Sequence, residues 1–290
     1  MPPSPSSPLA PHRSRAWIVI AAVVVIIAVV AALALGGVFT PAKSSVGSTP
    51  TYSQAVSQAN GVASGVSGGS WDLVLGAGIM TTAIASENLG SSKDCNITYS
   101  PGVTGTVTIP AAPSELTNGR ASGWIFLYRN AAEEYLIVTV TNGQASEFGT
   151  IAPKQACATV FNYFSVVPSN VIDSSAVASD VAGYAGAFLT AHPNANASYA
   201  LIGGASVFGL INFGPEWRVN YTACPFNAAV GTTGPAFNAT LNATTGAVMF
   251  EQSLPSVHCS SSSSIGLVKG GPPSLPLVRE IGSVGIARPR

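Results

Sequence analysis

SWDLVLGAG at residues 70–78 and SYALIGGAS at residues 198–206 are two stretches of the chain that read alike. Each is a short apolar run with an aromatic residue near its start, which predicts a strand. Each ends in small residues, which are typical of a bulge or of close backbone packing. The elements around these two stretches also occur twice, so the sequence predicts an internal repeat.

An amphipathic helix is predicted before each strand. Between residues 52 and 66, and again between 177 and 189, apolar residues recur every three to four positions. Thr49 or Thr51 can cap the first helix, and Asp173 or Ser174 the second. His192-Pro193 is expected to end the second helix.

Three more strands are predicted after a long connection in each half. The first of them carries a Trp and a Tyr four residues apart, which places both rings on one face. The last two are joined by a turn, at Asn142-Gly143 in the first copy and Thr244-Thr245-Gly246 in the second. The predicted strands are 124–128, 135–140 and 144–150, and then 217–221, 237–241 and 247–252.

The repeat predicts an α+β fold made of two tandem modules. In each module, one helix packs on an antiparallel sheet of three to four strands. The first module covers 51–160 and has an insertion at about 81–122, and the second covers 170–259. On this interpretation each module has a sheet of its own.

The N-terminal region predicts a single membrane crossing. Trp17 to Leu35 is nineteen residues without a charge, and such a helix spans about 28 Å of a hydrocarbon core of about 30 Å. Arg13 and Arg15 precede it, so residues 1–16 are expected to be a disordered cytoplasmic stub. The transmembrane helix covers 17–37, and the rest of the chain is expected to be extracytoplasmic.

Two other interpretations of this region stay open. Ala32-Leu33-Ala34 would serve as the cleavage site of a signal peptide. A pilin-like signal cut after Arg15-Ala16 would leave the apolar helix as an assembly stalk. On all three interpretations, 38–50 is a linker and 260–290 is a disordered tail rich in Ser, Gly and Pro.

The composition restricts the partners. Charged residues make up 8% of the chain, against about 25% in an average protein. From Pro41 to Cys259 there are six Lys or Arg and eleven Asp or Glu, a balance of −5. Nucleic acid requires a basic surface, so it is not an expected partner. Lipid contacts are expected only through the N-terminal helix, and few charges with many hydroxyl and amide groups are typical of a cell-surface protein.

The four cysteines all follow the predicted helix. An even number in an oxidising compartment predicts two disulfides, for which three pairings exist. The repeat favours closure within each half, Cys95–Cys157 and Cys224–Cys259, because Cys157 and Cys259 occupy equivalent positions after the last strand. No Cys-x-x-Cys occurs and the histidines are isolated, so no metal or cofactor is expected.

Five Asn-x-Ser/Thr sequons also suit an exported chain and are candidates for glycosylation. Their asparagines are Asn96, Asn196, Asn220, Asn238 and Asn242.

No catalytic residue is predicted. A nucleophile would need a histidine and an acid beside it, but His192 precedes a proline and His258 adjoins a cysteine expected in a disulfide. The rings of Trp71, Trp124 and Trp217 could grip a peptide or a glycan. For these three rings, and for Tyr128 and Tyr221, the repeat favours a place in the core instead. The chain is therefore expected not to be an enzyme.

The second half resembles the PepSY domain. The similarity covers Ser174 to Phe250 and rests on the Trp217-Arg218-Val219 strand and the Asn242-Ala243-Thr244-Thr245-Gly246-Ala247-Val248 hairpin. Asn242 stands where that family usually has Asp, and Ala247 where it often has Glu. The resemblance implies an exported, non-catalytic module that binds or inhibits a peptidase or another envelope component. The alternative is a structural surface-layer or pilus-like subunit, and the oligomeric state stays open.

Overall fold

A computed structural model describes residues 49–80, 85–89, 95–112, 117–207, 211–224 and 232–259. The predicted membrane helix, the linker up to residue 48 and the tail 260–290 lie outside these residues. No helix in the described ranges has the length and apolar character needed to cross a membrane.

The first half contains the predicted helix and four strands, with shorter strands added by the insertion. Its elements are α2 (Tyr52–Gly65), β1 (Asp72–Met80), β2 (Ala85–Asn88), β3 (Ile97–Tyr99), β4 (Thr106–Ile109), β5 (Gly123–Arg129), β6 (Tyr135–Thr141), β7 (Gln144–Ile151) and α3 (Ala156–Phe161).

The second half repeats the order of helix, strand, connection and three strands. Its elements are α4 (Ser174–Ala191), β8 (Asn196–Ile202), β9 (Ala205–Val207), β10 (Ile211–Phe213), β11 (Glu216–Thr222), β12 (Thr233–Asn242) and β13 (Val248–His258).

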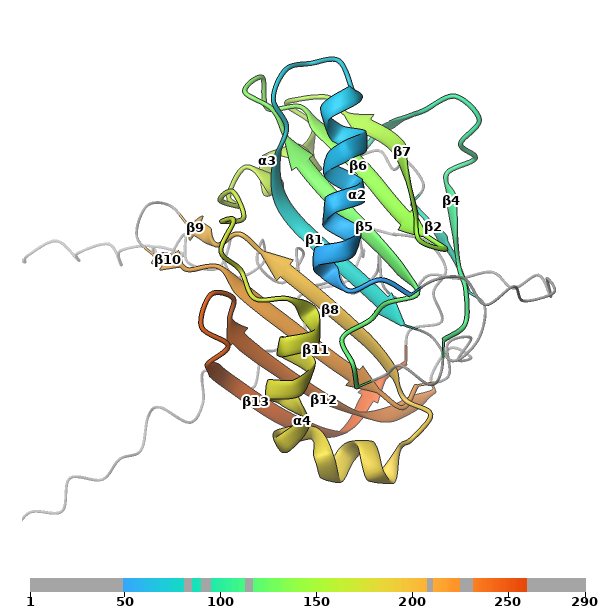
Figure 1. Cartoon of the computed structure of the whole chain (residues 1–290), viewed down its shortest axis with the longest axis vertical. Coiled ribbons are helices and arrows are strands. Elements are labelled where there is room, and N and C mark those ends of the chain that lie inside the picture. Colours follow the sequence, from blue (N-terminus) through green and yellow to red (C-terminus); the bar gives the residue numbers. More distant parts are fainter. Residues whose placement is uncertain are drawn as a thin grey trace, which may run out of the picture.

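The prediction of two separate sheets is wrong. The strands form one antiparallel sheet of nine, in the order β13-β12-β11-β8-β1-β5-β6-β7-β3 (Figure 1). The halves join where β1 pairs with β8, with Gly76 opposite Leu201 and Gly78 opposite Tyr199. Asp72, at the start of β1, is the only charged residue of these two strands. Neither edge is therefore protected by charge, and pairing them removes two open edges at once.

Both long helices lie on one face of this sheet (Figure 1). Their small buried residues, such as Ala55, Ala59 and Ala185, form one core with the aromatic rings of the strands. The glycines of β1 make this close packing possible. A Cβ added to Gly78 would lie 2.7 Å from the Trp124 ring, and one added to Gly76 would lie 3.1 Å from the Phe126 ring. These glycines therefore mark close packing, as predicted.

The opposite face carries a second core, which lies mostly in the first half and also includes Ile202 of β8. There Leu89, Ile109 and Phe161, from the insertion and α3, belong to the same cluster as Ile125 and Leu127 of β5. The insertion thus buries the face of the sheet that lies opposite the two long helices.

The two helices begin side by side, and residues at the start of α4 bond the first N–H groups of α2, which defines a helix junction (Thr51–Ser53 with Asp173–Ser175). Asp173 precedes α4, yet its carboxylate accepts the backbone N–H of Ser53 in α2 at 2.7 Å. The Ser174 hydroxyl accepts the N–H of Tyr52 at 2.8 Å and donates to the carbonyl of Gly119. The first N–H groups of α2 are therefore satisfied from the other half of the chain.

Candidate functional site

Most of the aromatic side chains considered for binding lie in the core. Trp124, Trp217, Tyr128 and Tyr221 are at most 1% exposed and pack under the helices, as the repeat favoured. The Trp124 and Trp217 indole N–H groups donate to the carbonyls of Pro50 and Ile172, so these rings are fixed at both ends. Trp71 differs, because it is only partly buried and lines a groove.

This groove has a volume of about 660 Å³ and lies between α2 and the segment that connects the two halves. We call it the Trp71 groove. One wall is the side of α2 that carries Val56 and Asn60, and the other is the chain from Val166 to Val171. Its size is in the range of about 300–1,000 Å³ that is usual for ligand sites.

The Trp71 groove presents apolar and polar surface in nearly equal shares, and its polar groups include hydroxyls and an amide. Trp71 donates its indole N–H to the carbonyl of Val66 at 3.3 Å, which fixes the ring plane. Val166 on the facing wall is 44% exposed, a large value for an aliphatic side chain. The Asn60 carbonyl oxygen accepts the Tyr128 hydroxyl at 2.8 Å, so the side chain of Asn60 is also held in place.

A second hollow of about 460 Å³ adjoins the groove and shares Gly69, Ser70 and Asp72 with it. Its other lining residues include Arg129, Asn130 and Glu133 of the β5–β6 turn. Asp72 thus lies between the Trp71 groove and a hollow lined by charged side chains.

The β5–β6 turn owes its shape to one buried amide. The Asn130 carbonyl oxygen accepts the N–H groups of Ala132 and Glu134, and its NH₂ group donates to the carbonyl of Gly68 and to the Glu134 carboxylate. This side chain closes the turn and bonds it to the loop before Trp71. The residues that line both hollows are therefore held in fixed positions.

The phenols beside the groove are poor proton carriers. Burial, with a smaller contribution from Asp173, raises the pKa of Tyr52, and burial likewise raises the pKa of Tyr128. Both remain neutral over the physiological range. In the described part of the chain, no group of three His, Cys, Asp or Glu could hold a metal ion. His192 packs against Phe188 at the end of α4, and His258 is exposed near the end of β13.

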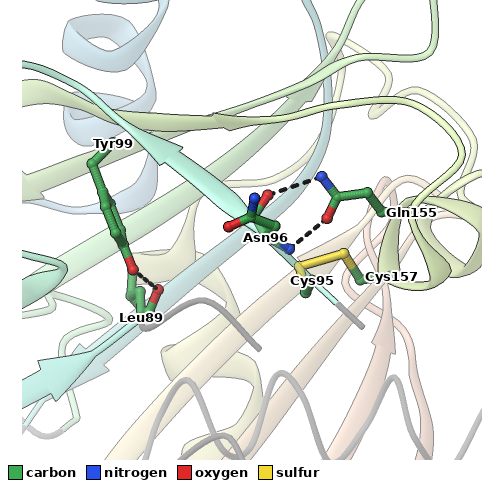
Figure 2. The surroundings of a disulfide bond; sticks show 6 residues. All are labelled: Leu89, Cys95, Asn96, Tyr99, Gln155 and Cys157. Atoms are coloured by element: carbon green, nitrogen blue, oxygen red, sulfur yellow. Dashed lines mark hydrogen bonds between the residues drawn. A yellow bond between two sulfur atoms is a disulfide. The ribbon is translucent and has the colours of Figure 1, made fainter. Parts of the chain in front are cut away.

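The disulfide prediction is confirmed, with the pairing that the repeat favoured. Cys95 is bonded to Cys157, and Cys224 to Cys259 (Figure 2 shows the first). The first ties the insertion to α3, and the second ties the end of β11 to the end of β13. The sequon asparagines lie in four different settings, and Asn96 is the exposed one of the five.

The sequence did not reveal the Trp71 groove, because its second wall is a connection without periodicity. The apolar triplet Val166-Val167-Pro168 was the available signal, since exposed connections are usually polar. Comparisons of the chain with protein-family models, curated proteins and solved structures found no match.

Proposed function

We propose that this chain is a membrane-anchored, extracytoplasmic, non-catalytic binding protein. Its Trp71 groove would take an extended, weakly charged polypeptide segment of an envelope partner such as a peptidase. The observation that carries the proposal is that the half-buried ring of Trp71 and the exposed side chain of Val166 line the same open groove. An aromatic ring of this kind offers a large contact area at a small entropic cost.

Four further features support this proposal. The two disulfides suit an oxidising compartment outside the cytoplasm. The acidic balance of the exported region disfavours polyanions as ligands. The serines and Asn60 along the groove offer donors and acceptors for a peptide backbone. The resemblance of 174–250 to the PepSY domain points to the same class of role.

A site-specific photocrosslinker tests the proposal. We would place a benzophenone amino acid at Val166 and, as the control, at Tyr184, which is 53% exposed on α4 away from the groove. After illumination of intact cells, we expect a discrete adduct from position 166 and none from position 184. Trp71→Ala in the first variant should abolish the adduct. Equal adducts at the two positions, or one that survives Trp71→Ala, would exclude the groove as the binding site.

A structural surface subunit is the second candidate, favoured by the outer strand β13. This strand is eleven residues long, and it contains the consecutive residues Met249 and Phe250, whose side chains are 54% and 41% exposed. A long edge with exposed apolar residues is suited to pairing with another strand. Electron microscopy of the cell surface distinguishes the candidates, since a regular array lost on Phe250→Lys would favour the structural role.

A further inference from the structure

The fold separates the five sequons into one that stays available for modification and four that take part in the structure. We propose that Asn96 is a glycosylation site and carries an N-linked glycan on the edge of the sheet. This inference is independent of the Trp71 groove and of any partner that binds there.

Asn96 is presented to solvent on a fixed backbone. Its N–H donates to the carbonyl oxygen of the Gln155 side chain, and its C=O accepts the Gln155 amide at 3.0 Å (Figure 2). The neighbouring Cys95–Cys157 disulfide restrains the same position. Both backbone groups are thus occupied, while the side chain of Asn96 is exposed and forms no hydrogen bond within the described residues.

The third residue of this sequon is presented in the same way. Asn96 and Thr98 are exposed, whereas Ile97 between them is buried. Alternate residues of a strand point to the same face, so the acceptor amide and the hydroxyl of Thr98 are accessible from one side. Among the described residues, β3 pairs with β7 alone and forms an outer edge of the sheet, so no described strand lies on its other side.

Asn196 is in the opposite situation. It is 6% exposed, and its amide nitrogen donates to the carbonyl of Cys224 at 2.9 Å. A sugar on that nitrogen would have to occupy the interior beside the second disulfide. A modified Asn196 is therefore incompatible with the folded chain.

The other three asparagines use their amides within the sheet. Asn220 and Asn238 face each other on β11 and β12, and the amide of Asn220 donates to the carbonyl oxygen of Asn238. The Asn242 carbonyl oxygen accepts both the N–H and the hydroxyl of Thr244 and the N–H of Thr245, which forms the last turn. All three are partly buried. Asn96 is thus the exposed acceptor of the five.

The chemistry requires a co-substrate from the membrane, a sugar linked to a lipid phosphate or diphosphate. The Asn96 amide nitrogen forms a bond to the anomeric carbon and loses one proton, and the bond from that carbon to the phosphate oxygen breaks. The lipid phosphate leaves as the free anion. The glycan would cover the β3 edge and leave β13 as the open edge of the sheet.

The test uses the full chain purified from the membranes of its natural host. After proteolysis, mass spectrometry should show the peptide containing Asn96 heavier by one glycan and the peptide containing Asn196 unmodified. Asn96→Gln and Thr98→Val should each abolish the added mass, and Thr98→Ser should restore it. Asn242→Gln is the matched control and should leave the added mass unchanged.

The thermal midpoint shows whether the variants fold. Because Asn96 and Thr98 are exposed, we expect the midpoints of their variants to stay near that of a deglycosylated wild-type chain. An unmodified Asn96 peptide from the natural host would overturn the proposal. Sugar found on Asn196 in folded protein would overturn it equally, because the burial argument would then be wrong.

Discussion

Replacing Asp173 by Asn tests whether the helix junction depends on charge. The carboxylate lies at the N-termini of α2 and α4, where it accepts the N–H of Ser53 and the hydroxyl of Ser175, each at 2.7 Å. A negative charge at one helix N-terminus contributes about 0.3–1 kcal/mol, and here it serves two. A hydrogen bond to a charged acceptor is stronger than one to a neutral acceptor by about 1 kcal/mol. Since Asp173 is only partly buried, solvent screening reduces the sum, and we expect Asp173→Asn to cost about 1–2 kcal/mol at pH 7.

The pH dependence follows from the direction of the Asp173 pKa shift. Burial raises this pKa, but the hydrogen bonds from Ser175, Ser53 and Thr51 together lower it below its usual value. The folded state therefore binds the proton less well than the unfolded state. The contribution of Asp173 is fully present above the unfolded pKa of about 3.9 and is lost as the pH falls through the lower folded value.

The assay is urea denaturation of both chains, followed by tryptophan fluorescence, at pH 7 and at pH 2.5. Asp180→Asn makes the same chemical change later in α4, beyond the first turn, and should shift the stability by less than about 0.5 kcal/mol. We expect the difference between wild type and Asp173→Asn to shrink at pH 2.5. A difference of the same size at both pH values would refute the electrostatic explanation, and no difference at pH 7 would show that the charge contributes nothing.

Three further predictions concern the core, the covalent links and the phenols. Gly78→Ala places a methyl group 2.7 Å from an indole ring and should cost about 1–3 kcal/mol in urea denaturation, whereas Gly61→Ala, where nothing lies within 4 Å, should stabilise α2 by up to about 1 kcal/mol. Replacing Cys224 and Cys259 together by Ser removes a disulfide between residues 35 positions apart, which should lower the free energy of unfolding by about 3–4 kcal/mol. An unchanged urea midpoint would show that the unfolded chain is restrained by other means. Burial raises the pKa of Tyr199 well above its usual value, so its phenol should ionise only on unfolding. The free energy of unfolding should therefore fall as the pH rises above about 10. A spectrophotometric titration in which every phenol of the folded protein ionises near pH 10 would contradict this.

The local elements were predictable because each is specified by residues close together in the sequence. Periodicity predicted helices at 52–66 and 177–189, and the structure has Tyr52–Gly65 and Ser174–Ala191. Aromatic spacing and turn residues predicted the three later strands of each half. The same repeat supported the disulfide pairing, because it related Cys157 to Cys259.

The joining of the sheets was not predictable in this way. A strand pattern shows which faces are buried, but it does not show what lies beyond a strand's edge. β1 and β8 are buried on both faces along most of their length, and this looks the same for a strand inside a small sheet and for one at the centre of a large one. The Trp71 groove was missed for a related reason, since it depends on where a non-periodic connection lies.

The pairing of β1 with β8 also determines the order in which the sheet can form during synthesis of the chain. Ala197 follows its partner Met80 by 117 residues, so the first half is completed long before its neighbour exists. At about 5–20 residues per second, translation would leave the β8-facing edge of β1 unpaired for roughly 6–23 s. Cys157 emerges within that interval, so the first disulfide can close and hold the early half together. We therefore expect newly synthesised chains that lack this disulfide to be the most dependent on chaperones.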